Sequence, residues 1–192
     1  MKTEITINKD KLLAAYNGAS DEQKQLLESM YGKDTFKSEN VMDRIKTFED
    51  ACEELGEGHQ YVKAYREWMR ISYAECKDIT AYLKLRIICA ALNDGWKPQF
   101  TEDEYRWYPL FTLWEEEELK DKSEEWKAGK KLWLFGGRSH NASACGLACA
   151  FSYSAWTYSS SFYSARLAVK SEELADYFGK QFIDIWADFL FS

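Results

Sequence analysis

The chain has 192 residues, of which 46% are hydrophobic and 16% aromatic, so it can bury a sizeable core as one domain or as a small domain with an elaboration. Its net charge of −7 and the lack of a basic stripe argue against a protein that binds nucleic-acid phosphates. Five cysteines at no disulfide-framework spacing favour free thiols.

The N-terminal residues lack the apolar core of a signal peptide, and no apolar run is long enough to span a bilayer. We therefore expect a protein made in the cytoplasm without a signal peptide and without membrane insertion. A virion-associated protein released by lysis would show the same pattern.

Helical patterns fill the first half of the chain. Ser20 to Gln23 form a capping-box pattern, and Gly32 is placed to end the helix that follows. Apolar spacing and breaker residues predict helices over 8–17, 21–31, 41–55, 61–73 and 78–92. The last of these has the widest apolar stripe and is expected to be the most buried, through Ile79, Leu83, Leu85, Ile87, Ile88, Ala91 and Leu92.

The composition changes at Trp96: residues 96–133 contain five Trp and both prolines of the chain. Residues 105–114 are strand-like, and the acidic stretch after them is predicted to be helical or looped. Alternation is imperfect in this region, so periodicity does not settle the assignment. Two further strand-like runs cover residues 132–135 and 165–170. Ser171 then caps a predicted C-terminal helix over 171–192, whose apolar face we expect in the core rather than in an oligomer interface: Leu174, Phe178, Phe182, Ile185, Trp186 and Phe189.

Residues 138–165, which we call the window, differ from the rest of the chain. These 28 residues contain eight Ser, six Ala, six aromatic residues and one formal charge, at Arg138. The other 164 residues contain 47 Lys, Glu, Gln or Met, so about eight would be expected in the window by proportion, and it has none. Burial explains part of this deficit but not the many Ser. The composition is typical of a paratope, where Tyr and Trp supply contact area and Ser supplies adaptable hydrogen bonds.

The residues at the two borders of the window resemble motifs of a known protein family. Gly136-Gly137-x-Ser139, followed by Ala165-Arg166-Leu167, resembles the closing segment of the C-type-lectin-like fold in its formylglycine-generating-enzyme branch, which reads GGSW and GFRL. That branch includes the variable proteins of diversity-generating retroelements of phages and prophages. Their ligand-binding residues are rewritten at AAY codons to NNY, which cannot encode Lys, Glu, Gln, Met or Trp. Only Trp156 in the window lies outside that set.

The resemblance covers roughly residues 96–170 and implies an α+β protein. Its parts would be a helical N-terminal module (1–95), a compact C-type-lectin-like mixed α/β ligand-binding domain (96–170) and a C-terminal amphipathic helix (171–192). The implied function is ligand binding, with a host cell-surface protein or glycan as partner and no cofactor or metal. The candidate ligand contacts are the positions between the framework motifs that NNY can encode: Ser139, His140, Asn141, Ser143, Phe151, Tyr153, Tyr158, Ser160, Phe162 and Tyr163.

Two other classes of function stay open. Cys145 and Cys149, with His140 upstream, would be the residues of an oxidase-like or metal-dependent enzyme, although two thiols and one imidazole leave a structural zinc site one ligand short. We favour ordinary packed thiols and no enzymatic activity. In a structural virion or assembly protein, the window would instead be an aromatic core. The sequence leaves open the ligand and whether the chain is a homo-oligomer.

Overall fold

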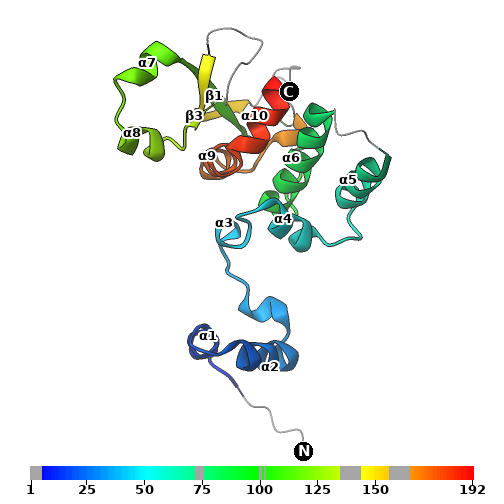
Figure 1. The fold of residues 1–192 in the computed structure, drawn as a ribbon. Coiled ribbons are helices and arrows are strands. Elements are labelled where there is room, and N and C mark those ends of the chain that lie inside the picture. Colours follow the sequence, from blue (N-terminus) through cyan, green and yellow to red (C-terminus); the bar gives the residue numbers. More distant parts are fainter. Residues whose placement is uncertain (1–5, 72–75, 100, 102, 135–143, 156–164) are drawn as a thin grey trace, which may run out of the picture. The chain divides into compact units, whose positions relative to one another are not determined.

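The computed structural model describes residues 6–71, 76–99, 101, 103–134, 144–155 and 165–192, without the side chains of residues 133, 144, 145, 150–155 and 165. The chain forms two compact units, Met1–Asn40 and Val41–Ser192. Figure 1 labels their α-helices and the strands β1 and β3.

The first unit is a small helical assembly. It contains α1 (Lys9–Asn17), α2 (Asp21–Tyr31) and the short 3-10 helix η1 (Lys33–Phe36). The predicted capping box between Ser20 and Gln23 is confirmed, and Gly32 ends α2 with a positive φ of 83°. Tyr16 stacks on Phe36 with ring centroids 4.2 Å apart. Neither α1 nor α2 has a buried residue, so this unit has little core of its own.

The helices of the second unit that precede its sheet pack around α6. They are α3 (Val41–Arg44), α4 (Phe48–Leu55), α5 (Gln60–Ile71) and α6 (Lys77–Asn93), with α4 and α5 in contact with α6. The prediction that α6 is the most buried of the early helices is confirmed, because eight of its residues are buried. Ile79 departs from the expected stripe and is exposed.

The sheet of this unit has three antiparallel strands. They are β1 (Arg106–Glu115), β2 (Trp133–Leu134) and β3 (Ala144–Ala155), in the order β1-β3-β2. The predicted strand over 105–114 is confirmed by β1, and the acidic stretch after it is helical, as α7 (Glu116–Lys120) and α8 (Glu124–Gly129). The register shifts at two places, each leaving one extra residue on β3, as in a β-bulge.

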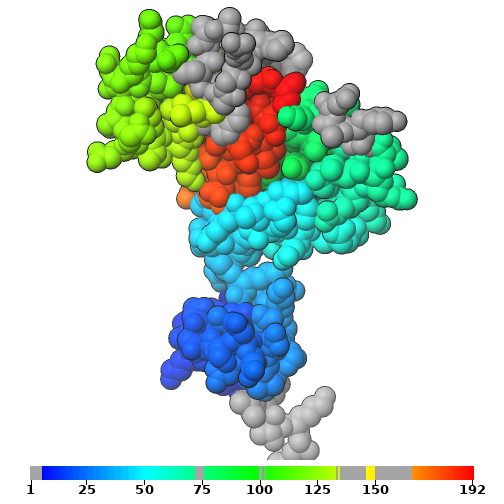
Figure 2. All heavy atoms as spheres, viewed as in Figure 1, coloured from blue at the N-terminus to red at the C-terminus, as the bar shows by residue number. Residues whose placement is uncertain are grey.

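Helices α9 (Glu172–Gln181) and α10 (Ile183–Phe191) form a layer between the sheet and α6. Figure 2 shows these helices in orange and red, between the yellow-green region of α7 and α8 on the left and the teal helices on the right. Five of the six residues of the predicted C-terminal apolar face are buried, and Phe189 packs against the same core. The face is therefore intramolecular core, as expected.

The α+β class is confirmed only in coarse form, since the described residues are mostly helical with one small antiparallel sheet. The sheet and α6 belong to the same compact unit. The division at residues 95 and 170 concerns independent folding and stays a prediction.

The single helix expected over 41–55 is wrong, because the chain breaks between α3 and α4. Thr47 and Asp50 form a capping box that starts α4. The carbonyl groups freed at the break accept hydrogen bonds from α9: Tyr177 Oη donates to Ile45 O (2.7 Å), and Gln181 Nε2 donates to Lys46 O (2.8 Å). Tertiary contacts thus override an apolar pattern that reads as one helix.

Two further expectations for the C-terminal region need correction. The expected helix over 171–192 is two helices, because Phe182 (φ −116°, ψ 33°) leaves the helical region while its side chain stays buried. Trp186 Nε1 donates to the Phe178 carbonyl beside this break. The strand expected over 165–170 is mostly the 3-10 helix η2 (Ala165–Leu167), and only Val169 forms a β-bridge, with Trp107.

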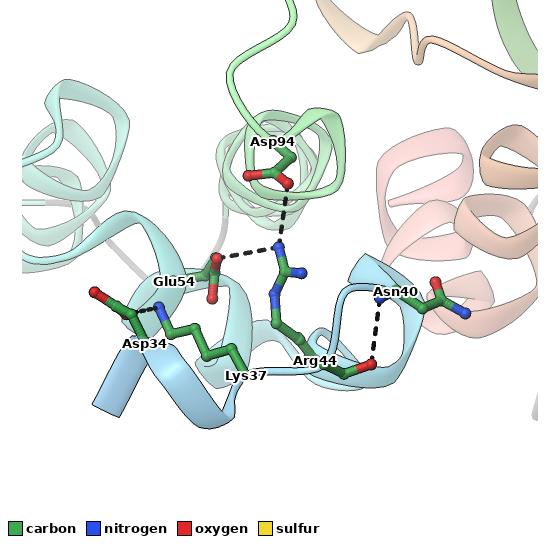
Figure 3. Close-up of polar contacts among 7 residues, drawn as sticks. Asp34, Lys37, Asn40, Arg44, Glu54 and Asp94 are labelled. Carbon is green, nitrogen blue, oxygen red and sulfur yellow. Dashed lines mark hydrogen bonds and ion pairs between the residues drawn. The ribbon is translucent and has the colours of Figure 1, made fainter. Parts of the chain in front are cut away.

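Arg44 connects three elements of the second unit. Its guanidinium lies 3.3 Å from Glu54 Oε1 on α4 and 3.4 Å from Asp94 Oδ2, just after α6 (Figure 3). Asp94 has a positive φ of 48° and caps α6. Because the Arg44 side chain is only 12% exposed, this network is shielded from solvent more than an ordinary surface ion pair.

Within the part of the chain that the structure describes, no helix has both the length and the apolar character needed to cross a bilayer.

Candidate functional site

Strand β3 is the described centre of the window. It lies between β1 and β2, and at Gly146 and Leu147 it pairs with both neighbours. A strand with two partners has its backbone groups bonded on both sides, so its path does not depend on the identity of outward-facing side chains. At Gly146 and Leu147 the strand is therefore fixed on both sides, while within the described part of the chain residues 148–155 pair with β1 alone.

The ten predicted contact residues divide around this strand. Only Phe151 and Tyr153 lie within it, and their Cα partners on β1 are Leu110 and Tyr108. Tyr108 is buried, and Leu110 is half-buried. The other eight lie outside the described residues: Ser139, His140, Asn141, Ser143, Tyr158, Ser160, Phe162 and Tyr163.

The undescribed parts of the window begin and end at described anchors. Residues 135–143 connect Leu134 to Ala144, and Leu134 pairs with Gly146 near that same end of β3. Residues 156–164 follow Ala155, and the chain then reaches Val169, which bridges to Trp107 opposite Ser154. A strand of this length spans roughly 35–40 Å at about 3.4 Å per residue. The two groups of predicted contacts are thus anchored at opposite ends of β3.

The close approach of α9 supports β3 and β1 from one side. A Cβ on Gly179 would lie 2.5 Å from Cys149 Sγ and 2.8 Å from Pro109 Cβ, distances that no side chain tolerates. Gly179 therefore lets the helix backbone come within contact of the sheet. Farther along, Phe111 of β1 packs on Trp186 of α10, with ring centroids 5.2 Å apart. This side of the sheet is core and is not available to a ligand.

The chain beyond the window is held by hydrogen bonds from two directions. On one side, Trp107 and Val169 exchange both backbone hydrogen bonds at 3.0 Å. On the other, buried Asn93 at the end of α6 donates from Nδ2 to Ala168 O (2.8 Å) and accepts from the Lys170 amide at Oδ1 (3.1 Å). Asn93 thus acts toward this segment as a neighbouring strand would. We call this arrangement the exit anchor.

Sequence analysis missed Asn93. A polar residue near the end of a helix usually indicates a helix cap. The neighbouring sequence gives no indication that Asn93 bonds a residue 75 positions away. The one available signal was its place at the end of the most apolar helix, where a buried amide must find hydrogen-bond partners.

Two buried cysteines, Cys149 and Cys89, do not resemble reactive thiols. Cys149 is buried, and burial raises the pKa of its thiol to about 11. Burial likewise raises the pKa of Cys89 to about 12, and its Sγ donates to Ala168 O (3.2 Å). Because the thiolate is the reactive form, both thiols are poor nucleophiles at neutral pH. The side chains of Cys145 and His140 are outside the described residues.

No group of His, Cys, Asp and Glu able to hold a metal ion occurs among the side chains that are described. Comparison of the chain with models of protein families, with curated proteins and with solved structures gives no match.

Proposed function

We propose that this chain is a diversified ligand-binding protein of a phage or prophage, which presents the window to a host cell-surface protein or glycan. The observation that carries the proposal is the window's composition, with eight Ser, six aromatic residues and no Lys, Glu, Gln or Met. The C-type-lectin-like fold of residues 96–170 and the absence of an enzymatic role are parts of the same proposal.

The way in which the window is anchored supports this. Its central strand is bonded through backbone groups to β1 and β2, and the exit anchor uses Asn93 and Trp107, which lie outside the window. Side chains between such anchors can change while the hydrogen bonds that hold the segment persist. A protein that diversifies its binding residues needs this separation.

Binding would use two contact groups, because the undescribed parts of the window are anchored at opposite ends of β3. The first group is Ser139, His140, Asn141 and Ser143, and the second is Tyr158, Ser160, Phe162 and Tyr163. Since a few aromatic anchors dominate most interfaces, the second group would supply most of the affinity. Phe151 and Tyr153 lie on β3 between the two groups.

The alternatives are less well supported. An oxidase-like or metal-dependent enzyme would have to use Cys149, whose thiol is buried and protonated at neutral pH. A structural virion or assembly protein gains some support from the first unit, where Leu26 and Met30 are about 60% exposed on α2. That feature fits a protein docked on a larger particle, which a diversified binding protein can also be.

The direct test is the DNA around the gene. The proposal requires an imperfect repeat of the coding segment for residues 136–166, differing mainly at adenines, beside a reverse-transcriptase gene. A complete flanking sequence with neither feature would contradict diversification. The composition of the window would then need another explanation.

Ligand contact is tested separately by replacing aromatic anchors with serine. The triple substitution of Tyr158, Phe162 and Tyr163 to Ser should abolish binding to host cells and leave the melting temperature nearly unchanged, because exposed substitutions usually cost within about 0.5 kcal/mol. The matched control is Tyr105→Ser, an exposed tyrosine outside the window, which should keep binding. A triple variant that unfolds would show that these residues are core.

A further inference from the structure

The second unit contains a cavity that the proposed ligand-binding function does not use. Its volume is about 590 Å³, within the range of small-molecule sites. It lies beside the C-terminal half of α6, between the start of α5, the segment that follows α6, and the residues after the window. We call it the basic pocket, defined by His59, Tyr61, Arg86, Trp96, Lys97 and Arg166.

The charge of this pocket is opposite to that of the protein. Three cationic side chains, Arg86, Lys97 and Arg166, line it, and neither Asp nor Glu is among its described lining residues. The chain as a whole has a net charge of −7. Concentrated positive charge in a cavity of an acidic protein requires a local reason, because like charges in a concave site repel one another.

Three described carboxylates near the pocket in sequence are paired with other cations. Glu54 and Asp94 pair with Arg44, as Figure 3 shows. Glu57, next to the pocket in sequence, pairs with Arg66 at 2.8 Å. Among the described residues, no ion pair involves a cation of the pocket.

Arg86 has the most constrained position of the three cations. Its Cζ atom lies 4.1 Å from the centroid of the Tyr61 ring, so the guanidinium is held against an aromatic face. Its Nε atom is buried and has no hydrogen-bond partner among the described residues. A buried N–H without an acceptor is costly, and an acceptor supplied by a ligand would remove that cost.

The pocket also has aromatic walls. Tyr61 and half-buried Trp96 line it together with His59, whose ring meets Tyr61 edge-on at 5.0 Å. The Tyr61 amide donates to His59 Nδ1, which places the proton of the neutral imidazole on Nε2. Burial, and then the charge of Lys97, lower the pKa of His59, as expected where the local potential is positive.

We propose that the basic pocket binds a small organic anion, with its acid group held by Arg86, Lys97 and Arg166 and a flat ring placed against Tyr61 and Trp96. This site is independent of the window's proposed ligand, so either proposal can fail without the other. The geometry indicates the class of ligand: the cations favour an anion, the aromatic walls favour a ring, and the volume fits a small molecule.

The test uses two fluorescent probes that differ in one group. Anilinonaphthalenesulfonate is a flat aromatic anion, and N-phenylnaphthylamine is the same ring system without the sulfonate. Titration of the full chain should give one saturable site for the anion and at least about tenfold weaker binding of the neutral probe, since charge-assisted contacts dominate. The anion's affinity should also fall with added salt.

Substitutions locate the site and separate its two components. Lys97→Gln and Arg166→Gln remove exposed cations and should each weaken the anion about threefold, without changing the neutral probe. Trp96→Ala should weaken both probes. The control Lys63→Gln makes the same charge change on an exposed residue of α5 that does not line the pocket, and it should change neither affinity. Melting temperatures of all four variants establish that they are folded.

Three results would overturn the proposal. These are equal affinity for the two probes, an unchanged affinity for the anion in the Lys97→Gln, Arg166→Gln double variant, and binding of the anion without saturation. Each would mean that the probe binds an apolar surface elsewhere, such as the exposed side of α2, and that the pocket's charge has no ligand-binding role.

Discussion

The exit anchor gives the most quantitative prediction. Asn93 is 4% exposed, and its side-chain amide makes two hydrogen bonds to backbone groups that follow the window. Asn93→Ala removes both bonds at once and leaves a small cavity at the end of α6. The helix itself should tolerate the change, since Ala is the best helix former.

The expected loss of stability depends on which hydrogen-bond partners the two backbone groups have after the substitution. The Ala168 carbonyl is in a buried residue and keeps only the weak Cys89 thiol donor, so it loses most of a hydrogen bond at about 1–3 kcal/mol. The Lys170 amide is half-buried and can bond to water, so its loss should cost less, about 0.5 kcal/mol. The sum, with the cavity, is about 2–3 kcal/mol.

The assay is urea unfolding followed by tryptophan fluorescence, with hydrogen exchange at the Lys170 amide as a local readout. Gln60→Ala is the matched control, because Gln60 is exposed at the start of α5 and its side chain has no hydrogen bond among the described residues. The control should stay within about 0.5 kcal/mol of the parent. If Asn93→Ala matched the control and exchange at Lys170 were unchanged, the reasoning about the exit anchor would be refuted.

Asn93→Asp adds a pH dependence to the same test. The introduced carboxyl is buried, and when ionised it faces the Ala168 carbonyl, so its folded pKa should lie above the unfolded value of about 3.9. A group with a raised folded pKa stabilises the folded state below its unfolded pKa and loses that contribution as the pH rises through its folded pKa. The deficit of this variant against the parent should therefore be largest at neutral pH and shrink toward pH 4. An unchanging deficit would mean that the site is open to water.

Three further predictions concern the packing of α9 on the sheet, the Arg44 ion-pair network and the Cys149 thiol. Gly179→Ala should destabilise the protein by about 1–3 kcal/mol, because its Cβ would overlap Cys149 Sγ. Adding Cys149→Ala should restore part of the lost stability. If urea unfolding showed that the losses of the two substitutions simply add, the proposed clash would be contradicted. Arg44→Met should cost about 1–2 kcal/mol by leaving Glu54 half-buried without its cation, whereas the exposed-pair control Arg66→Met should cost less than about 0.5 kcal/mol. Burial raises the pKa of the Cys149 thiol to about 11, so Cys149 should resist iodoacetamide at pH 8 in the folded chain and react fast in urea. Rapid labelling of Cys149 without urea would favour the enzyme hypothesis again.

Local signals were sufficient where neighbours in sequence decide the structure. The capping box of Ser20 and Gln23 and the stripe of α6 were predicted from residues within one element, whereas the strand character of residues 105–114 was seen without a regular alternation to settle it. In each case the hydrogen bonds or the buried face involve positions a few residues apart, which is the range that periodicity and caps report.

Prediction failed where a side chain distant in sequence determines the backbone conformation. The break before α4 depends on Tyr177 and Gln181, which serve carbonyl groups more than 130 residues away in the chain. The hydrogen bonds of Ala168 and Lys170 likewise come from Asn93 of α6, where the sequence predicted an ordinary strand. No local pattern encodes such pairings, so an apolar run reads as a continuous helix or strand until its partners are known.

The two anchors of the window also bear on how it could vary. If its side chains are rewritten as proposed, substitution must not disturb the hydrogen bonds that hold the segment, and the backbone pairing of β3 meets this requirement for any residue except proline. Gly146 is the exception along this strand: its added Cβ would meet Leu119 and Leu132 at about 3.0 Å, so a larger residue there would force those side chains to move. The proposal therefore predicts that a collection of variants of this gene keeps Gly146 fixed while residues 139–143 and 158–163 differ. Sequencing many copies of the locus would decide this, and free variation at Gly146 together with constant flanks would contradict it.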